Sequence, residues 1–197
     1  MSVDAEKRRI RSEIRLRRRE VAPHDAARAA EAVAALLAPL PELCRAGRIA
    51  LYAALDDELP TRPLFEALRA LGKPLFLPRV TVGDPLAFYP VTRWDDLRVG
   101  HFGVLEPPAE AEAAALGEGD VVIAPGVAFD LSGNLLGRGR GYYDRAFSID
   151  STAGGSLLLG LGYEFQVLPR VPASAHDRGM DGIATEQRVL WVERGAS

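Results

Sequence analysis

The hydrophobic positions of the first segment repeat with a helical period. Residues 4–20 contain no Gly or Pro, and their apolar side chains fall on one narrow stripe at about 100° per residue. The stripe consists of Val3, Ile10, Ile14 and Val21. So thin a stripe predicts a helix that lies on the rest of the protein instead of being enclosed by it.

Helices and strands are then predicted in alternation. Pro23 starts an Ala-rich helix that runs to about Leu37, where the segment Pro39–Pro41 ends it. Thr61 is a plausible N-cap for a helix that stops at Gly72. Short apolar runs predict strands at 48–53, 74–78, 86–91, 120–126, 156–162 and 189–192, with irregular structure over 94–106 and a helix from about 142. This alternation predicts an α/β sandwich around a mostly parallel sheet.

The composition places the chain among ordinary globular proteins. It has 197 residues, which suits a single domain over 1–197, with 48% hydrophobic and 26% charged residues. A net charge of −3 argues against a general nucleic-acid-coating protein. The single cysteine, Cys44, excludes an internal disulfide, and no apolar run approaches the roughly 18 residues of a membrane helix. We therefore expect a cytoplasmic protein.

The most informative stretch is the glycine-rich segment 137–145, which reads Gly-Arg-Gly-Arg-Gly-Tyr-Tyr-Asp-Arg. Glycines at alternate positions leave the backbone N–H groups accessible to phosphate oxygens, and Arg138 and Arg140 add planar cationic groups suited to phosphate. Asp144 could hold a magnesium ion that bridges phosphates. The spacing is neither a Rossmann fingerprint nor a P-loop, and a surface loop with solvated arginines is the alternative.

Carboxylates elsewhere offer further candidates. Asp177 or Asp181 could complete a magnesium site, although a solvated turn is the simpler interpretation. Glu58 follows the first predicted strand, where ligands of open α/β sheets bind, and could accept hydrogen bonds from an amino-substituted ring. An ordinary acid at a helix entry is the alternative. Aromatic residues that could wall a flat ligand are Tyr52, Phe102 and Tyr142.

The basic N-terminal helix can be interpreted in two ways. Lys7 and Arg11 lie four residues apart on one flank of the apolar stripe, so they could reach a triphosphate from the edge of the helix. Arg17 and Arg18 also lie near the stripe, so geometry does not single out the first pair. A solvated charged helix is the alternative, and a third possibility is RNA binding, which the acidic overall balance disfavours.

Several motifs along the chain occur together in one known family. The strongest are Pro125–Asp130, Gly133–Asn134 and 136–144, in that order and spacing. Further matches are Leu77–Arg79, Phe102–Gly103 with Glu106–Pro107, Gly162–Gln166, His176–Asp177, Thr185–Glu186 and the opening Lys7 and Arg11. On these motifs the chain resembles the 5-formyltetrahydrofolate cyclo-ligase family nearly from end to end.

The resemblance implies an activity and a fold. It implies a three-layer, Rossmann-like α/β sandwich that cyclises 5-formyltetrahydrofolate to 5,10-methenyltetrahydrofolate with ATP and Mg²⁺, giving ADP and phosphate. The formyl oxygen attacks the γ-phosphate of ATP, and N10 of the folate then closes the ring. ATP and the folate would be the partners of a monomer that binds neither nucleic acid nor membrane. A related enzyme that activates a different amide with ATP is the second possibility.

The resemblance also implies roles for particular residues. The nucleotide would be bound by Lys7, Arg11, Leu135, Leu136, Gly137, Arg138, Gly139, Arg140, Gly141, Tyr142 and Tyr143. The folate would contact Ala53, Glu58, Phe102, Arg138, Gly139, Arg140, Gly141 and Tyr142. Catalysis would fall to Arg138, Arg140 and Tyr143, and magnesium to Asp144 and Asp177. Many bacterial members have three glycines where this chain has Gly139, Arg140 and Gly141, so Arg140 should act by charge and hydrogen bonding.

Overall fold

The computed structural model describes residues 2–55, 57–79, 86–100, 103–108, 111–139, 146, 155–172 and 179–193. The helices in this part of the chain are α1 (Val3–Glu20), α2 (Pro23–Leu37), α3 (Pro41–Arg45) and α4 (Arg62–Ala70). Two 3₁₀ turns lie at Trp94–Asp96 and Glu164–Gln166. The bounds of α1 and α2 agree closely with the predicted helices, because both segments have a clear apolar stripe and Pro23 marks the start of the second.

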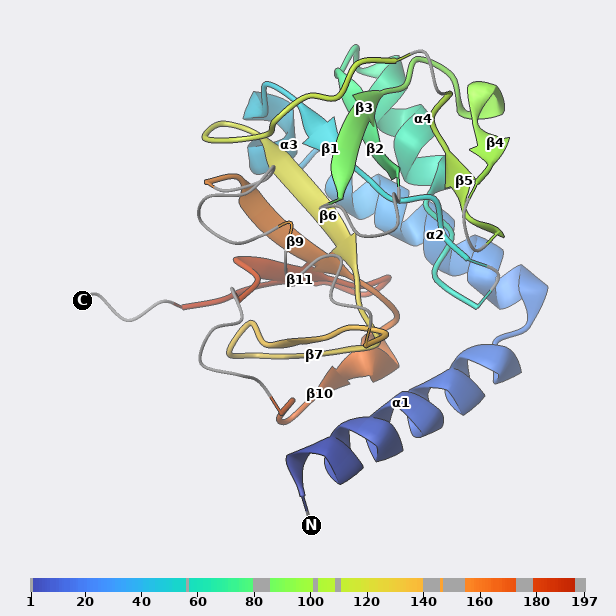
Figure 1. The fold of residues 1–197 in the computed structure, drawn as a ribbon, viewed down its shortest axis with the longest axis vertical. Coiled ribbons are helices and arrows are strands. Elements are labelled where there is room, and N and C mark those ends of the chain that lie inside the picture. The colour runs from blue at the N-terminus through green and yellow to red at the C-terminus, as the bar shows by residue number, and fades with distance from the viewer. Residues whose placement is uncertain are drawn as a thin grey trace.

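A seven-stranded sheet runs through the centre of the molecule in the order β12-β11-β9-β6-β1-β2-β3 (Figure 1). Its strands are β1 (Ile49–Ala50), β2 (Leu75–Arg79), β3 (Ala87–Pro90), β6 (Val121–Pro125), β9 (Leu157–Leu161), β11 (Gly182–Ala184) and β12 (Val189–Trp191). The five inner strands are parallel, and β3 and β12 pair antiparallel at the two edges. The prediction of an α/β fold around a mostly parallel sheet is confirmed.

Hydrophobic layers cover both faces of this sheet. On one face α2 and α4 pack on the strands, as Figure 1 shows. The fully buried residues of that layer include Leu37, Leu43, Ile49, Leu64, Phe65, Leu68 and Leu159. The opposite face buries Phe88, Leu116, Phe129, Ala146, Leu158, Met180 and Ile183. Apolar side chains thus pack on both faces of the strands, which gives the predicted three layers.

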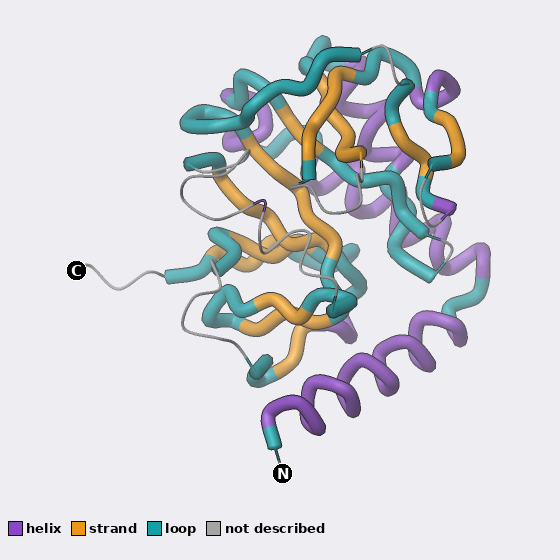
Figure 2. The backbone as a smooth tube through the Cα atoms, in the orientation of Figure 1, coloured by secondary structure: helices purple, strands orange, loops and turns teal. Residues whose placement is uncertain are grey.

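A smaller sheet and α1 form a second packing unit. The small sheet has the order β10-β7-β8, with β7 (Ala128–Asp130), β8 (Leu135–Leu136) and β10 (Val167–Leu168). Helix α1 lies along its side (Figure 2). Ile10 and Ile14 are buried there against Val127, Leu136 and Val171. The predicted stripe is confirmed at these two positions, whereas Val3 at the start of the helix is exposed.

Several predicted details were wrong. Thr61 is the N-cap residue of α4 as predicted, but its hydroxyl does not cap the helix and instead donates to the Tyr52 carbonyl at 2.5 Å. The first strand is only two residues long, and its pairing with β2 ends at Leu51, whose N–H donates to the Phe76 carbonyl at 2.9 Å. The segment 94–106 is not simply irregular but contains a hairpin of β4 (Arg98–Val99) and β5 (Leu105–Glu106). Strands this short have too few residues to show a period in the sequence.

Phe129 reaches the main sheet because two glycines leave room for its ring. A Cβ atom added to Gly160 would lie 2.3 Å from Cε1 of Phe129, and one added to Gly126 would lie 2.4 Å from its Cζ. Since Phe129 is fully buried, its ring has no free space into which it can move. These glycines therefore fix how closely β7 packs on the main sheet.

We expect Gly160→Ala to lower the free energy of unfolding by about 1–3 kcal/mol, the usual cost of overpacking a dense core. Urea unfolding measures the change. Gly47→Ala is the matched control, because its added Cβ would meet Asp120 at an ordinary 3.5 Å. An equal loss in both variants would contradict the packing argument.

Candidate functional site

Arg138 is held by two acidic residues that lie about eighty positions earlier in the chain. Its Nη2 donates to Oδ1 of Asp57 at 2.8 Å and to Oε1 of Glu58 at 2.9 Å, and its Nε donates to the same Glu58 oxygen at 3.1 Å. Asp57 and Glu58 follow β1, and Arg138 follows β8. The fold therefore brings the predicted glycine-rich segment and the predicted Glu58 together at one point.

Glu58 is a buried carboxylate with a defined orientation. Its side chain is 7% exposed, and its second oxygen, Oε2, accepts a hydrogen bond from the Leu55 N–H at 3.0 Å. Both oxygens of the carboxylate therefore have protein donors, as a buried acid requires. Glu58 is thus more than an exposed acid at a helix entry.

Helix α1 contributes a second arginine to the same place. Nε of Arg11 donates to the Gly137 carbonyl at 2.9 Å. Its guanidinium carbon lies 3.6 Å from the position of a Cβ added at Gly139, whose φ of +93° itself favours glycine. Lys7 is half-buried one turn earlier on the helix. Helix α1 and the glycine-rich segment therefore meet at Arg11, and the phosphate contacts of Lys7 and Arg11 stay a prediction.

Arg18 is a site residue that the sequence did not single out. It is one of the most buried charged residues, with a side chain that is 4% exposed, and it donates to the Gly126 carbonyl and to Oε1 of Gln166. Its Nη1 lies 3.8 Å from Oδ2 of Asp57. The only sequence signal was its place beside the apolar stripe of α1, which it shared with other arginines of this helix.

Gln166 anchors the neighbouring turn after β9. Its side-chain nitrogen donates to the carbonyls of Gly126 at 2.8 Å and Val127 at 3.0 Å, and its oxygen accepts from the Tyr163 N–H at 3.0 Å. The rings of Tyr163 and Phe165 are stacked 5.3 Å apart, and the guanidinium of Arg17 lies over Phe165. These hydrogen bonds and ring contacts hold the turn after β9 in place.

Burial and the neighbouring charges shift the pKa values of the charged side chains in the site. Burial opposes the charged form of Asp57, but the hydrogen bond from Arg138 and the positive charges of Arg138 and Arg18 outweigh it and hold the Asp57 pKa below its ordinary value. Burial also opposes the charge of Arg138, but Glu58 and Asp57 raise the pKa of Arg138. Burial lowers the pKa of Arg18. At neutral pH these groups form an ionised network.

A small cavity of about 20 Å³ opens where these side chains meet. It is lined by Arg11, Arg15, Arg18, Asp57, Val127 and Arg138. Four guanidinium groups thus face one carboxylate of the lining, which gives the cavity an excess of positive charge. An anion is the kind of ligand that this arrangement favours.

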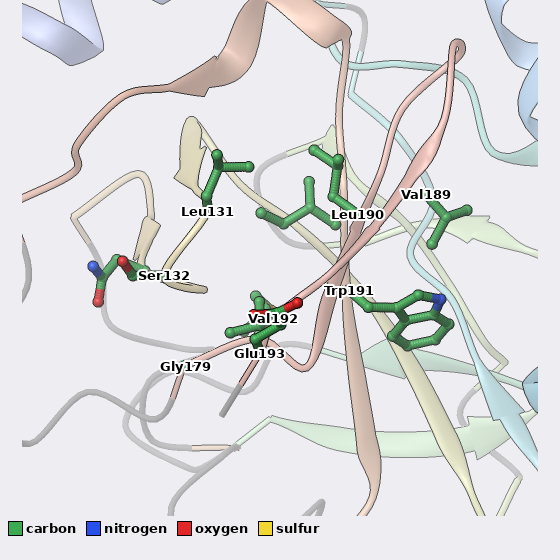
Figure 3. A pocket seen from close by; sticks show the side chains of 11 residues that line it. Leu131, Ser132, Gly179, Val189, Leu190, Trp191, Val192 and Glu193 are labelled. Atoms are coloured by element: carbon green, nitrogen blue, oxygen red, sulfur yellow. The ribbon is translucent and has the colours of Figure 1, made fainter. Parts of the chain in front are cut away.

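A larger cavity of about 810 Å³ lies at the turn of the β7–β8 hairpin, against β11 and β12. Figure 3 shows its lining, in which Leu131 of the turn and Trp191 of the edge strand both take part. The complete lining is Leu131, Ser132, Asn134, Gly179, Met180, Ile183, Val189, Leu190, Trp191, Val192 and Glu193. None of the predicted site residues belongs to it.

Other predicted residues have different positions. Ala53 is buried in the layer under α2 and α4, and Leu136 is buried under α1, whereas Leu135 and Gly137 are half-buried. Outside the described residues lie Phe102, Arg140, Gly141, Tyr142, Tyr143, Asp144 and Asp177. Among the described residues no three His, Cys, Asp or Glu side chains gather as a metal site would require. The magnesium site stays a prediction from the sequence.

No helix in the described part of the chain is long and apolar enough to cross a membrane.

Fold and site together define an α/β protein with a cationic, carboxylate-braced site beyond the carboxyl ends of its parallel strands. A family model described as the 5-formyltetrahydrofolate cyclo-ligase family matches residues 3–186. The chain therefore belongs to this family and is an enzyme of the ligase class, as the motifs predicted.

Individual relatives agree with this assignment. A 5-formyltetrahydrofolate cyclo-ligase of Mycolicibacterium smegmatis is 32% identical over 73% of this chain and 75% of the relative. The mouse enzyme of the same name is 26% identical over 94% of this chain and 96% of its own length. The solution structure of Aquifex aeolicus 5,10-methenyltetrahydrofolate synthetase is 35% identical, with a TM-score of 0.82 over 97% of this chain and 95% of that one.

We expect the network to make unfolding sensitive to acid. Because the folded pKa of Asp57 lies below its unfolded value of about 3.9, its contribution is full above that value and is lost as the pH falls through the folded pKa. Asp57→Asn should therefore flatten the fall in the free energy of unfolding between about pH 5 and pH 2. Urea titrations at several pH values across this range measure the free energy of unfolding.

The control for this experiment is Asp95→Asn, which removes the carboxylate of an exposed ion pair with Arg62. Exposed pairs contribute little to stability, so this variant should keep the wild-type acid dependence. If Asp57→Asn also keeps it, the carboxylate is not held as the contacts indicate.

Proposed function

We propose that this chain catalyses the ATP-dependent cyclisation of 5-formyltetrahydrofolate to 5,10-methenyltetrahydrofolate, with ADP and phosphate as the other products. The observation that carries the proposal is the convergence of Arg11 and Arg138 on one cavity, braced by Asp57 and Glu58, in a chain of this family. The cluster of guanidinium groups supports attraction of a polyphosphate, and a neighbouring carboxylate supports binding of an amino-substituted ring.

The proposed reaction needs positioning and charge more than covalent help. The formyl oxygen attacks the γ-phosphorus of ATP, so that an O–P bond forms while the bond to ADP breaks. N10 of the folate then attacks the activated carbon, and phosphate leaves. Negative charge on the transferred group must be stabilised throughout, which guanidinium groups held in place can do. Arg138 and Arg11 are proposed for this role on the nucleotide side.

Glu58 is proposed to face the pterin end of the folate. Its carboxylate is buried and already oriented by Leu55 and Arg138, so a hydrogen bond to the ligand would need little reorganisation. Ala53 and Phe102 are proposed to lie on the same side. In this arrangement Arg138 lies between the two substrates. It contacts Glu58 on one side and belongs to the segment 137–139 on the other.

Magnesium belongs to the same proposal. Asp144 and Asp177 would hold the ion, which would supply positive charge to the phosphate oxygens. Arg140 and Tyr143 are proposed as further catalytic groups, and Leu135, Leu136, Gly137, Gly139, Gly141 and Tyr142 as part of the nucleotide lining. A monomer of one domain over 1–197, located in the cytoplasm, completes the proposal.

The RNA-binding alternative finds less support. Arg18 is buried and donates to Gly126 and Gln166, and Arg17 donates to the Phe165 carbonyl, so these two arginines are less available to the phosphates of RNA. Protein carbonyls and an aromatic ring thus already bind some of the basic side chains of α1.

Purified protein supplied with 5-formyltetrahydrofolate, ATP and Mg²⁺ should accumulate the methenyl product, which absorbs in the near ultraviolet. The absorbance should rise only when ATP is present. No ATP-dependent rise at high enzyme concentration would remove the proposal. Stabilisation against heat by ATP but not by folates would instead favour activation of a different amide.

Arg138→Ala should lower kcat/KM strongly, by about 2–4 kcal/mol of transition-state stabilisation, because a placed charge is removed. Steady-state kinetics and the melting temperature are measured together. Arg28→Ala is the matched control, since Arg28 forms an exposed ion pair with Asp25 on α2. Unchanged kinetics in the Arg138 variant would contradict the assigned role.

A further inference from the structure

Asp57 divides its two carboxylate oxygens between two arginines. Oδ1 accepts a hydrogen bond from Arg138 at 2.8 Å, and Oδ2 lies 3.8 Å from Nη1 of Arg18. Among the described residues Asp57 is the side chain that contacts both arginines, although the two arginines also repel each other and Glu58 attracts both. Three residues from α1, the loop after β1 and the segment after β8 thus form one chain of contacts.

The two arginines at the ends of this series of contacts differ in how firmly they are held. The Arg18 side chain is 4% exposed and is bonded to Gly126 and Gln166, whereas the Arg138 side chain is 39% exposed. Arg18 also sits on the last turn of α1, where the helix dipole favours a cation. Arg18 is therefore the fixed end, and Arg138 is the end that needs support.

Charge leads to the same conclusion. Arg18 and Arg138 carry two positive charges, and Asp57 and Glu58 carry two negative charges, so the group of four is balanced. Without Arg18, Asp57 would lose one of its two cationic partners, and its attraction would act mainly on Arg138. Arg138 would then be held more tightly by Asp57 and Glu58 and would be less available to an incoming phosphate.

We propose that Arg18 is a positioning residue of this enzyme, which acts through Asp57 to hold Arg138 in the place where it meets the transferred phosphoryl group. This inference rests on the proposed function. Arg18 lines the cavity, but its guanidinium is bonded to Gly126 and Gln166, so in this assignment it acts on turnover through Arg138 and only as long as Arg138 is present.

A double-mutant cycle tests the inference. Arg18→Met keeps the length and apolar stem of the side chain but removes its charge, and should lower kcat on the order of 10- to 100-fold, as small misplacements of catalytic groups do. In an Arg138→Ala background the same change should alter kcat by less than about twofold, because the group that Arg18 positions is gone. Arg18→Lys should recover part of the loss.

Arg19→Met is the matched control, because Arg19 is the next residue on α1 and is exposed. It should leave kcat unchanged both in the wild-type and in the Arg138→Ala background. Melting temperatures show whether each variant is folded at the assay temperature. A loss of kcat in Arg18→Met that is equally large in the Arg138→Ala background would show a merely structural role and overturn the inference, as would a folded Arg18→Met with wild-type kcat.

A second readout is independent of the reaction. The shifts in melting temperature of Arg18→Met and Arg138→Met should be non-additive with Asp57 present, and markedly closer to additive in an Asp57→Asn background, where only their direct repulsion and Glu58 still link them. Wild-type protein without cyclisation activity would refute the proposed function, while this cycle still decides whether the two arginines are coupled through Asp57. Additive shifts in both backgrounds would overturn the coupling.

Discussion

The site depends on one buried ionic arrangement, in which Asp57 and Glu58 bind arginines from two distant segments. Removing charges from water is costly, and the cost is repaid only where each ion has opposite charges and hydrogen-bond partners. Here those partners are main-chain groups as well as side chains: Gly126 accepts from Arg18, and Leu55 donates to Glu58. The backbone of the α/β frame therefore fixes the ions, and the ions in turn fix the segment that begins at Gly137.

The parallel sheet explains why these residues meet. Strands β1, β6 and β9 are neighbours and run in the same direction, so the loops that follow them converge at one edge. Asp57 and Glu58 come from the first of these loops and Gly126 from the second, while Gln166 follows the third. Gln166 and Gly126, which lie 40 positions apart, become partners because the crossover connection returns the chain to the same edge.

The fold class and part of the site could be predicted from the sequence. Long periodic segments such as α1 and α2 were predicted with accurate bounds, and the strands of the main sheet other than β11 appeared as apolar runs. The short strands β4, β5, β7, β8, β10 and β11 were missed, because two or three residues show no period. Glu58 and Arg138 were both predicted, but nothing local shows that they bind each other. Arg18 was indistinguishable from neighbouring arginines, since its burial is decided by Gly126 and Gln166, which are far away in the sequence.

Helix α1 has few hydrophobic anchors relative to its length. Only Ile10 and Ile14 among its apolar residues are buried, and they pack on the small sheet instead of on the central one. The large core could thus remain assembled while this helix detaches, because local opening needs only the contacts of the detached part to break. Such a detachment would carry Arg11 and Arg18 away together. The cationic site therefore depends on a peripheral helix with few apolar contacts. Detachment of this helix would disrupt the site before the central sheet unfolds.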